Sequence, residues 1–157
     1  SRALNKNHTV TRQYLNYFEK KGVVKKKNVG KMTLYKLNEN YALFIQIISL
    51  IEKERLIQKS ENLFLREIVD FASILKNAAV VIFGSFVDNP KKAEDVDILI
   101  VGKTSDIDFE KIENKINKKI HLVQSDNFDE INLSLREEIR KKHLIIKNVE
   151  EAVKWLI

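Results

Sequence analysis

The sequence predicts mixed α and β structure in two parts, a small basic helix-and-hairpin module followed by an α/β domain. Residues 7–21 have the apolar spacing of a helix, and two short strand-like runs follow them. From residue 78 onward, short apolar runs alternate with amphipathic stretches. The charge is also unevenly distributed: residues 1–38 hold ten lysines or arginines and a single acid, whereas the remainder of the chain is mildly acidic.

The composition is that of an ordinary soluble protein. Its 157 residues suffice for one domain or two small ones, and it has no cysteine, so disulfides and thiolate metal sites are excluded. The longest apolar run, residues 41–51, is too short to span a bilayer, and no secretion signal is visible. We therefore expect a cytoplasmic protein without a membrane partner.

The first expected element is a helix over residues 7–21, ended by Gly22. Its apolar positions lie on one face, which we expect to point inward: Val10, Tyr14, Tyr17 and Phe18. The opposite face is polar and is expected in solvent: Thr11, Arg12, Gln13 and Asn16. Residues 23–24 and 32–37 then read as the strands of a hairpin whose tip, residues 25–31, is cationic.

Residues 2–5 and 9–24 resemble the second and third helices of winged helix-turn-helix proteins, and the likeness extends over residues 1–38 without the family's first helix. The resemblance implies DNA binding. The residues that would face the major groove are Thr9, Thr11, Arg12, Gln13 and Asn16, and those that would contact phosphates are Lys25, Lys26, Lys27 and Lys31. The alternative is a solvated lysine-rich face.

Residues 41–59 and 60–76 are predicted to be two helices that form a linker over residues 39–76. The first carries apolar residues on more than one stripe, so it requires burial on two sides. Two interpretations remain open: a homodimer built on this helix, and packing between the two parts of one chain.

The remaining chain, residues 77–157, is predicted to form the α/β domain. Strands are expected at residues 80–83, 96–101 and 120–123, with a short extended piece at 144–146. Helices are expected at residues 107–119, 128–142 and 149–157.

The residues that could bind a ligand or catalyse a reaction lie at the ends of two predicted strands of this domain. The first apolar run ends on Gly84 and Ser85, and the second opens with Asp95 and Asp97. Side chains two apart on a strand share a face, so the two carboxylates are expected to converge. Such a pair at the end of an apolar strand is costly unless a cation joins it, and a divalent metal is the natural candidate.

This arrangement, Gly84-Ser85, then nine residues (86–94), then Asp95-Val96-Asp97, resembles the nucleotidyltransferase superfamily that includes DNA polymerase β, in particular its minimal branch. The likeness covers residues 71–123. It implies transfer of a nucleoside monophosphate from ATP or another NTP to a hydroxyl group, with Mg²⁺ held by the catalytic residues Asp95 and Asp97. Gly84 and Ser85 would then bind the triphosphate.

Two departures from this pattern leave a second function open. The position of the family's third metal-binding carboxylate is His121, and Phe86 stands where many relatives have an arginine. We interpret His121 as an ordinary strand residue, with Asp126 as a weaker candidate for the missing carboxylate. The alternative function is therefore a catalytically weakened, antitoxin-like DNA-binding regulator of transcription, which senses nucleotide or binds a partner such as a HEPN-type protein.

Overall fold

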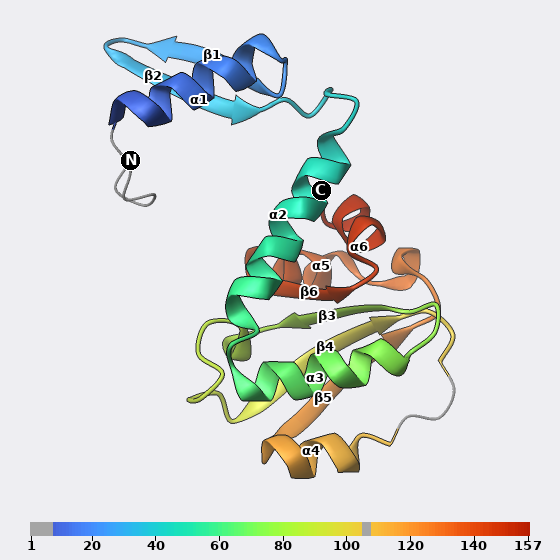
Figure 1. Cartoon of the computed structure of the whole chain (residues 1–157). Coiled ribbons are helices and arrows are strands. Elements are labelled where there is room, and N and C mark those ends of the chain that lie inside the picture. Colours follow the sequence, from blue (N-terminus) through green and yellow to red (C-terminus); the bar gives the residue numbers. More distant parts are fainter. Residues whose placement is uncertain (1–7, 105–107) are drawn as a thin grey trace. The chain divides into compact units, whose positions relative to one another are not determined.

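A computed structural model describes residues 8–104 and 108–157, and within them it contains six α-helices and two β-sheets (Figure 1). The predicted mixture of helices and strands is therefore confirmed. The chain divides into two compact units, residues 1–47 and 48–157, and each is described by itself. No helix of the described residues is long and apolar enough to cross a membrane.

Unit 1 consists of a helix and a hairpin. Helix α1 covers His8–Lys20, and strands β1, Val24–Val29, and β2, Met32–Leu37, pair antiparallel around a turn at Gly30. The prediction that the apolar face of α1 points inward is wrong. Its side chains are 37–55% exposed: Val10, Tyr14, Tyr17 and Phe18. Of the side expected in solvent, Arg12 and Gln13 are exposed, whereas Asn16 faces the hairpin, because its Oδ1 accepts a 3.3 Å hydrogen bond from the Tyr35 hydroxyl of β2.

Unit 2 begins within helix α2 and contains a four-stranded sheet. Its helices are α2, Phe44–Lys59; α3, Leu63–Ile74; α4, Glu110–Ile116; α5, Leu133–Lys141; and α6, Val149–Leu156. Its strands are β3, Ala79–Phe83; β4, Asp95–Val101; β5, Lys119–Ser125; and β6, His143–Lys147. The strand order is β5-β4-β3-β6, and β4 and β5 run parallel while the other pairs are antiparallel.

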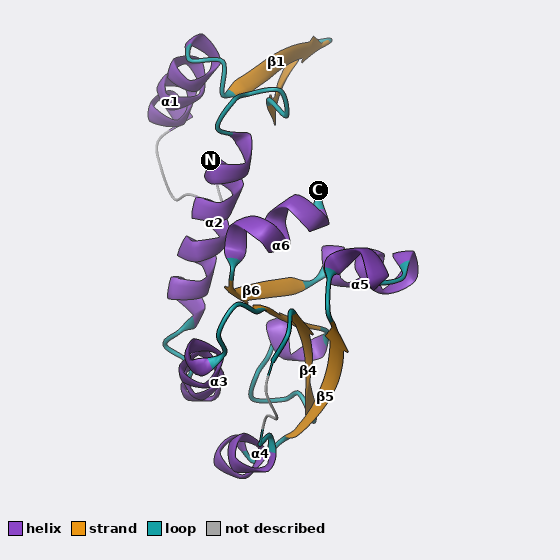
Figure 2. Ribbon diagram, turned by 90° about the vertical axis from the view of Figure 1, so that its right-hand side faces the viewer, coloured by secondary structure: helices purple, strands orange, loops and turns teal. Residues whose placement is uncertain are grey.

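The alternation of side chains along the strands gives the sheet two different faces. Val80, Ile82, Val96 and Ile98 point to one face and form a buried cluster with residues of α3 and α4. The other face carries the intervening residues, and α5 and α6 lie on that side (Figure 2). Asp95 and Asp97 alternate with Val96 and Ile98, so they belong to the face of α5 and α6.

Two predicted helices differ in length from the observed ones. The helix expected at 107–119 is only α4, because Asn117 adopts a left-handed conformation that ends it and β5 then begins at Lys119; residue 107 lies outside the described residues. The helix expected at 128–142 is broken into a short 3₁₀ turn, Phe128–Glu130, and α5. The break occurs because Asn132 caps α5, its side chain accepting a 2.9 Å hydrogen bond from the Leu135 amide.

Candidate functional site

The strand pairing of unit 2 brings three separate stretches of sequence to one end of the sheet. Phe83, the last residue of β3, lies opposite Asp97 on β4, and Asp97 lies opposite His121 on β5. Gly84 and Ser85 follow β3 directly. This register therefore assembles the glycine–serine turn, the two aspartates and the histidine at neighbouring positions.

Asp95, Asp97 and His121 form a compact group of possible metal ligands. The Nδ1 atom of His121 lies 3.3 Å from Asp95 Oδ2 and 3.4 Å from Asp97 Oδ1. One ligand atom from each residue lies within 4.8 Å of the other two. The aspartate side chains are 35% and 27% exposed and that of His121 is 64% exposed, so the group is half-buried and open to solvent on the histidine side.

The electrostatics of this group favour a cation. Burial raises the pKa of Asp97 above its ordinary value, and the neighbouring carboxylate of Asp95 raises it further. His121 acts in the opposite direction through its hydrogen bond and charge, and Glu138 on α5 adds a smaller unfavourable contribution. Asp97 is therefore ionised at some cost, which a bound cation would remove.

Gly84 is fixed by its contact with Asp97. Its φ of 73° and ψ of −153° fall in a region of backbone conformation that essentially only glycine occupies. A Cβ atom built on Gly84 would lie 2.2 Å from Asp97 Oδ2. The absence of a side chain at residue 84 therefore lets the turn lie directly against the acidic pair.

A hollow of about 370 Å³ adjoins the acidic pair. It is lined by Ser85, Asn89, Lys92, Ala93, Glu94 and Asp95. Lys92 offers a positive charge there, and Asn89 Oδ1 accepts a hydrogen bond from the Lys92 amide at 3.2 Å. Sequence reasoning missed Asn89, since a single asparagine in a loop carries no signal without the fold. A larger hollow of about 800 Å³ lies between α2 and α6, and no residue of the site lines it.

The donor set fits one divalent metal ion. Two ligand atoms that each lie about 2.1 Å from an ion, at about 90–110° to one another, are separated by about 3.0–3.4 Å. The two separations measured from His121 Nδ1 are 3.3 and 3.4 Å. His121 Nδ1 therefore lies at ligand spacing from each aspartate, and the three residues could together hold an ion as two carboxylate ligands and one imidazole.

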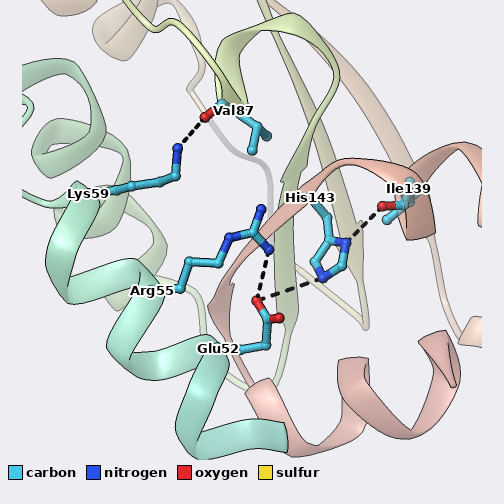
Figure 3. Close-up of polar contacts among 6 residues, drawn as sticks. All are labelled: Glu52, Arg55, Lys59, Val87, Ile139 and His143. Carbon is cyan, nitrogen blue, oxygen red and sulfur yellow. Dashed lines mark hydrogen bonds and ion pairs between the residues drawn. The ribbon is translucent and has the colours of Figure 1, made fainter. Parts of the chain in front are cut away.

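One hydrogen bond joins α2 to the turn that follows Ser85, and a separate group of polar contacts joins α2 to β6 (Figure 3). Lys59 Nζ donates a 2.6 Å hydrogen bond to the carbonyl of Val87. Glu52 pairs with Arg55 at 3.3 Å and with His143 Nε2 at 3.7 Å. The Nδ1 atom of His143 lies 2.9 Å from the Ile139 carbonyl, which can only accept, so this nitrogen carries a proton. The 3₁₀ turn Ser85–Val87 is thus anchored to α2 by the hydrogen bond from Lys59.

The residues expected to meet DNA lie in unit 1, where a groove of about 470 Å³ separates α1 from the hairpin. Of these residues, the groove is lined by Thr11, Arg12, Lys26 and Lys31. Lys26 lies opposite Tyr35, whereas Lys25 and Lys27 lie opposite Lys36 and Leu34 and so point to the other face of the hairpin. Thr9 and Gln13 are exposed on α1, and Asn16 is bonded to Tyr35.

In a comparison with protein families, residues 64–156 match the nucleotidyltransferase domain. The match covers more than half of the chain. The chain belongs to the nucleotidyltransferase domain family. The matched region of this nucleotidyltransferase contains β3–β6, α3–α6 and every residue of the metal-ligand group. Membership in this family implies an NTP substrate and a metal, and the nucleotidyltransferase domain predicted from Gly84-Ser85 and Asp95-Val96-Asp97 is confirmed.

Solved structures include two with a weaker likeness to the nucleotidyltransferase. A crystal structure of a toxin-antitoxin with AMP-PNP is 16% identical with a TM-score of 0.40, over 58% of this chain and 82% of that chain. A mutant of the toxin-antitoxin MntA-HpeT is 15% identical with a TM-score of 0.37, over 59% and 80%. No curated protein matches the sequence.

Proposed function

We propose that this nucleotidyltransferase transfers a nucleoside monophosphate from ATP or another NTP to a hydroxyl acceptor, and that Asp95 and Asp97 are its catalytic metal ligands. The observation that carries the proposal is the convergence of Gly84-Ser85 with the acidic pair at one end of the sheet. An acidic pair alone would hold a metal. The adjoining glycine–serine turn adds the surface on which a metal-bound triphosphate can lie.

Each residue has a distinct task in this proposal. The backbone at Gly84 allows phosphate oxygens to approach closely, and the Ser85 hydroxyl donates a hydrogen bond to one of them. Lys92 neutralises part of the polyphosphate charge from the wall of the adjoining hollow. The predicted metal is Mg²⁺. When bound, it would stabilise charge on the attacking and leaving oxygens.

The reaction is a substitution at phosphorus. The acceptor oxygen forms a bond to the α-phosphorus, the bond from that phosphorus to the bridging oxygen breaks, and pyrophosphate leaves. The hydroxyl proton passes to solvent, since the third carboxylate that would receive it is replaced by His121. This substitution predicts a slow chemical step.

The test is transfer of label from ATP that carries ³²P in its α-phosphate. Wild-type protein with Mg²⁺ or Mn²⁺ should label itself or an acceptor in a cell extract, and Asp97→Ala should remove the label. Asp129→Ala, an exposed aspartate of the 3₁₀ turn, is the matched control and should keep wild-type transfer. Equal labelling by wild type and Asp97→Ala would reject the proposal.

A second candidate function is favoured by His121. An imidazole in place of the third carboxylate is compatible with a protein that binds nucleotide without transferring it, as an antitoxin-like regulator that responds to ATP or to a protein partner such as a HEPN-type protein. Tight ATP binding without any transfer of label, in wild type and in His121→Asp, would favour this function over the enzyme.

For unit 1 we propose DNA binding through a winged-helix-like surface, supported by the clustering of Arg12, Lys26 and Lys31 around one groove. Positive charge at these positions predicts that DNA affinity falls steeply as salt rises. A plot of the logarithm of the binding constant against the logarithm of salt concentration should have a slope of about one unit for each phosphate contact. The double variant Lys26→Ala/Lys31→Ala should lower the slope by about two. Lys25→Ala/Lys27→Ala, on the opposite face of the hairpin, is the charge-matched control. Fluorescence anisotropy with a random-sequence duplex measures both, and equal effects would reject the groove.

A homodimer through α2 remains a proposal as well. Leu50 and Ile57 lie one heptad apart on this helix and are 68% and 69% exposed. Sedimentation at micromolar concentration should give a dimer that Leu50→Glu converts to monomer. A monomeric wild type would reject the proposal.

A further inference from the structure

We propose that the group Asp95–Asp97–His121 prefers a divalent transition-metal ion to Mg²⁺, and that His121 is the ligand that sets this preference. The inference rests on the proposed function in that it concerns the metal of the same site. It goes beyond that function by naming the class of ion and the residue that selects it.

The position of His121 is fixed by the sheet. Asp97 and His121 are partners in the parallel pairing of β4 with β5, and the pairs on either side, Val96 with Ile120 and Ile98 with Leu122, hold the same register. His121 therefore cannot leave the acidic pair by a shift of the strand without moving Ile120 and its neighbours out of their packing.

The chemistry of the donor set favours transition metals. Mg²⁺ takes oxygen ligands and retains bound water, and it gains little from an imidazole nitrogen. Imidazole binds divalent transition metals well, and affinity rises from Mn²⁺ through Fe²⁺ and Co²⁺. Replacing a carboxylate by a neutral imidazole also removes one negative charge, which weakens the electrostatic attraction on which Mg²⁺ depends. The imidazole nitrogen offsets part of this loss for a transition metal but not for Mg²⁺, so the exchange of ligands favours the transition metal.

The geometry places one specific atom at the site. Nδ1, and not Nε2, is the nitrogen that lies 3.3 and 3.4 Å from the two carboxylates, at the separation of ligands that share an ion. The competing possibility is that a protonated imidazole neutralises the aspartates and takes the place of the metal. The two possibilities differ in whether nitrogen is bonded to a metal, and this difference is measurable.

The experiment uses Mn²⁺ as its probe, because Mn²⁺ stands at the weak end of the affinity series and gives a conservative estimate of the preference. Electron paramagnetic resonance of the full chain, with and without a non-hydrolysable ATP analogue, gives Mn²⁺ affinity directly and Mg²⁺ affinity by competition. We expect the ratio of Mn²⁺ to Mg²⁺ affinity to fall at least about tenfold in His121→Asp. His8→Asp, the same change at an exposed histidine of unit 1, should leave the ratio unchanged.

A spectroscopic readout separates ligation from a structural role. Electron spin-echo modulation should show ¹⁴N coupled to bound Mn²⁺ in wild type, and the coupling should be lost in both His121→Asp and His121→Ala. Absence of nitrogen coupling, equal Mn²⁺/Mg²⁺ ratios in wild type and His121→Asp, or no metal binding at all would overturn the inference. Mn²⁺ binding with nitrogen coupling but no nucleotide transfer would retain it and reject the enzyme, whereas transfer without nitrogen coupling would do the reverse.

Discussion

At the scale of single residues, Gly84 and Asp97 are the most constrained pair of the site. Gly84→Ala would place a methyl group 2.2 Å from Asp97 Oδ2 and would also force alanine into a conformation reserved for glycine. We expect a loss of about 2–3 kcal/mol in unfolding free energy and loss of Mn²⁺ binding. Thermal unfolding and metal titration measure the two effects.

The control for this variant is Gly30→Ala in the hairpin turn. Gly30 also has a positive φ, but a Cβ there would meet nothing within 4 Å. It should therefore show only the backbone cost, about 1 kcal/mol, and leave metal binding unchanged. Unimpaired metal binding in Gly84→Ala would mean that the contact with Asp97 is not required.

Asp97 itself is expected to lower the stability of the metal-free protein. Its pKa is raised in the folded state, so the unfolded chain releases this proton more readily and stability falls as the pH rises through the ordinary value and then the folded one. Asp97→Asn should therefore raise the unfolding free energy at pH 7, by no more than about 1 kcal/mol because solvent screens a partly exposed group. The gain should vanish at pH 3. Fluorescence of Trp155, the single tryptophan, reports the transition.

At the scale of elements, the docking of α2 on the sheet depends on Glu52. Burial alone would raise the pKa of Glu52, but the hydrogen bonds and charges of His143 and Arg55 outweigh it and lower the pKa. Its stabilising contribution is therefore present above the ordinary value and is lost as the pH falls through the folded one. Glu52→Gln should cost about 1–2 kcal/mol at pH 6 and progressively less as the pH falls through the lowered pKa of the folded state. Glu54→Gln, bonded only to exposed Gln58, should cost little at either pH.

The order of elements in unit 2 could be predicted from the sequence because its strands are apolar runs bounded by clear breaks. The group at their ends could be predicted because the spacing of Asp95 and Asp97 is that of one strand face. The proximity of His121 could only be suspected, since it depends on a parallel pairing between strands separated by α4. Asn89 and the Glu52–His143 pair could not be predicted, because they arise where loops and α2 meet the sheet.

The prediction of which face of α1 points inward failed for a different reason. Periodicity identified an apolar face, but tertiary packing decides which face a helix turns toward its neighbour. In unit 1 the hairpin packs on the side that carries Thr11, Leu15 and Asn16. The periodicity of residues 7–21 therefore predicted the helix correctly but predicted its buried face incorrectly.

At the scale of the whole molecule, the two units differ in how much they bury. None of residues 8–47 is buried, whereas unit 2 encloses a continuous core around β3 and β4. Hydrogen exchange measured by mass spectrometry should therefore be much faster in β1 and β2 than in β3 and β4. Addition of DNA should slow exchange in unit 1 and leave β3 unchanged. Equal protection of the two units without DNA would contradict this expectation.

The parallel pairing of β4 with β5 has a genetic consequence. Deleting one residue from the short connection at 117–118 would displace β5 by one position, so that Leu122 would take the place of His121 and the imidazole would take the place of Ile120, which packs against the hydrophobic core. Chemistry and folding would fail in the same event. In-frame deletions at this connection should therefore be eliminated by selection even in cells that have no need of the catalytic activity but cannot tolerate a misfolded chain.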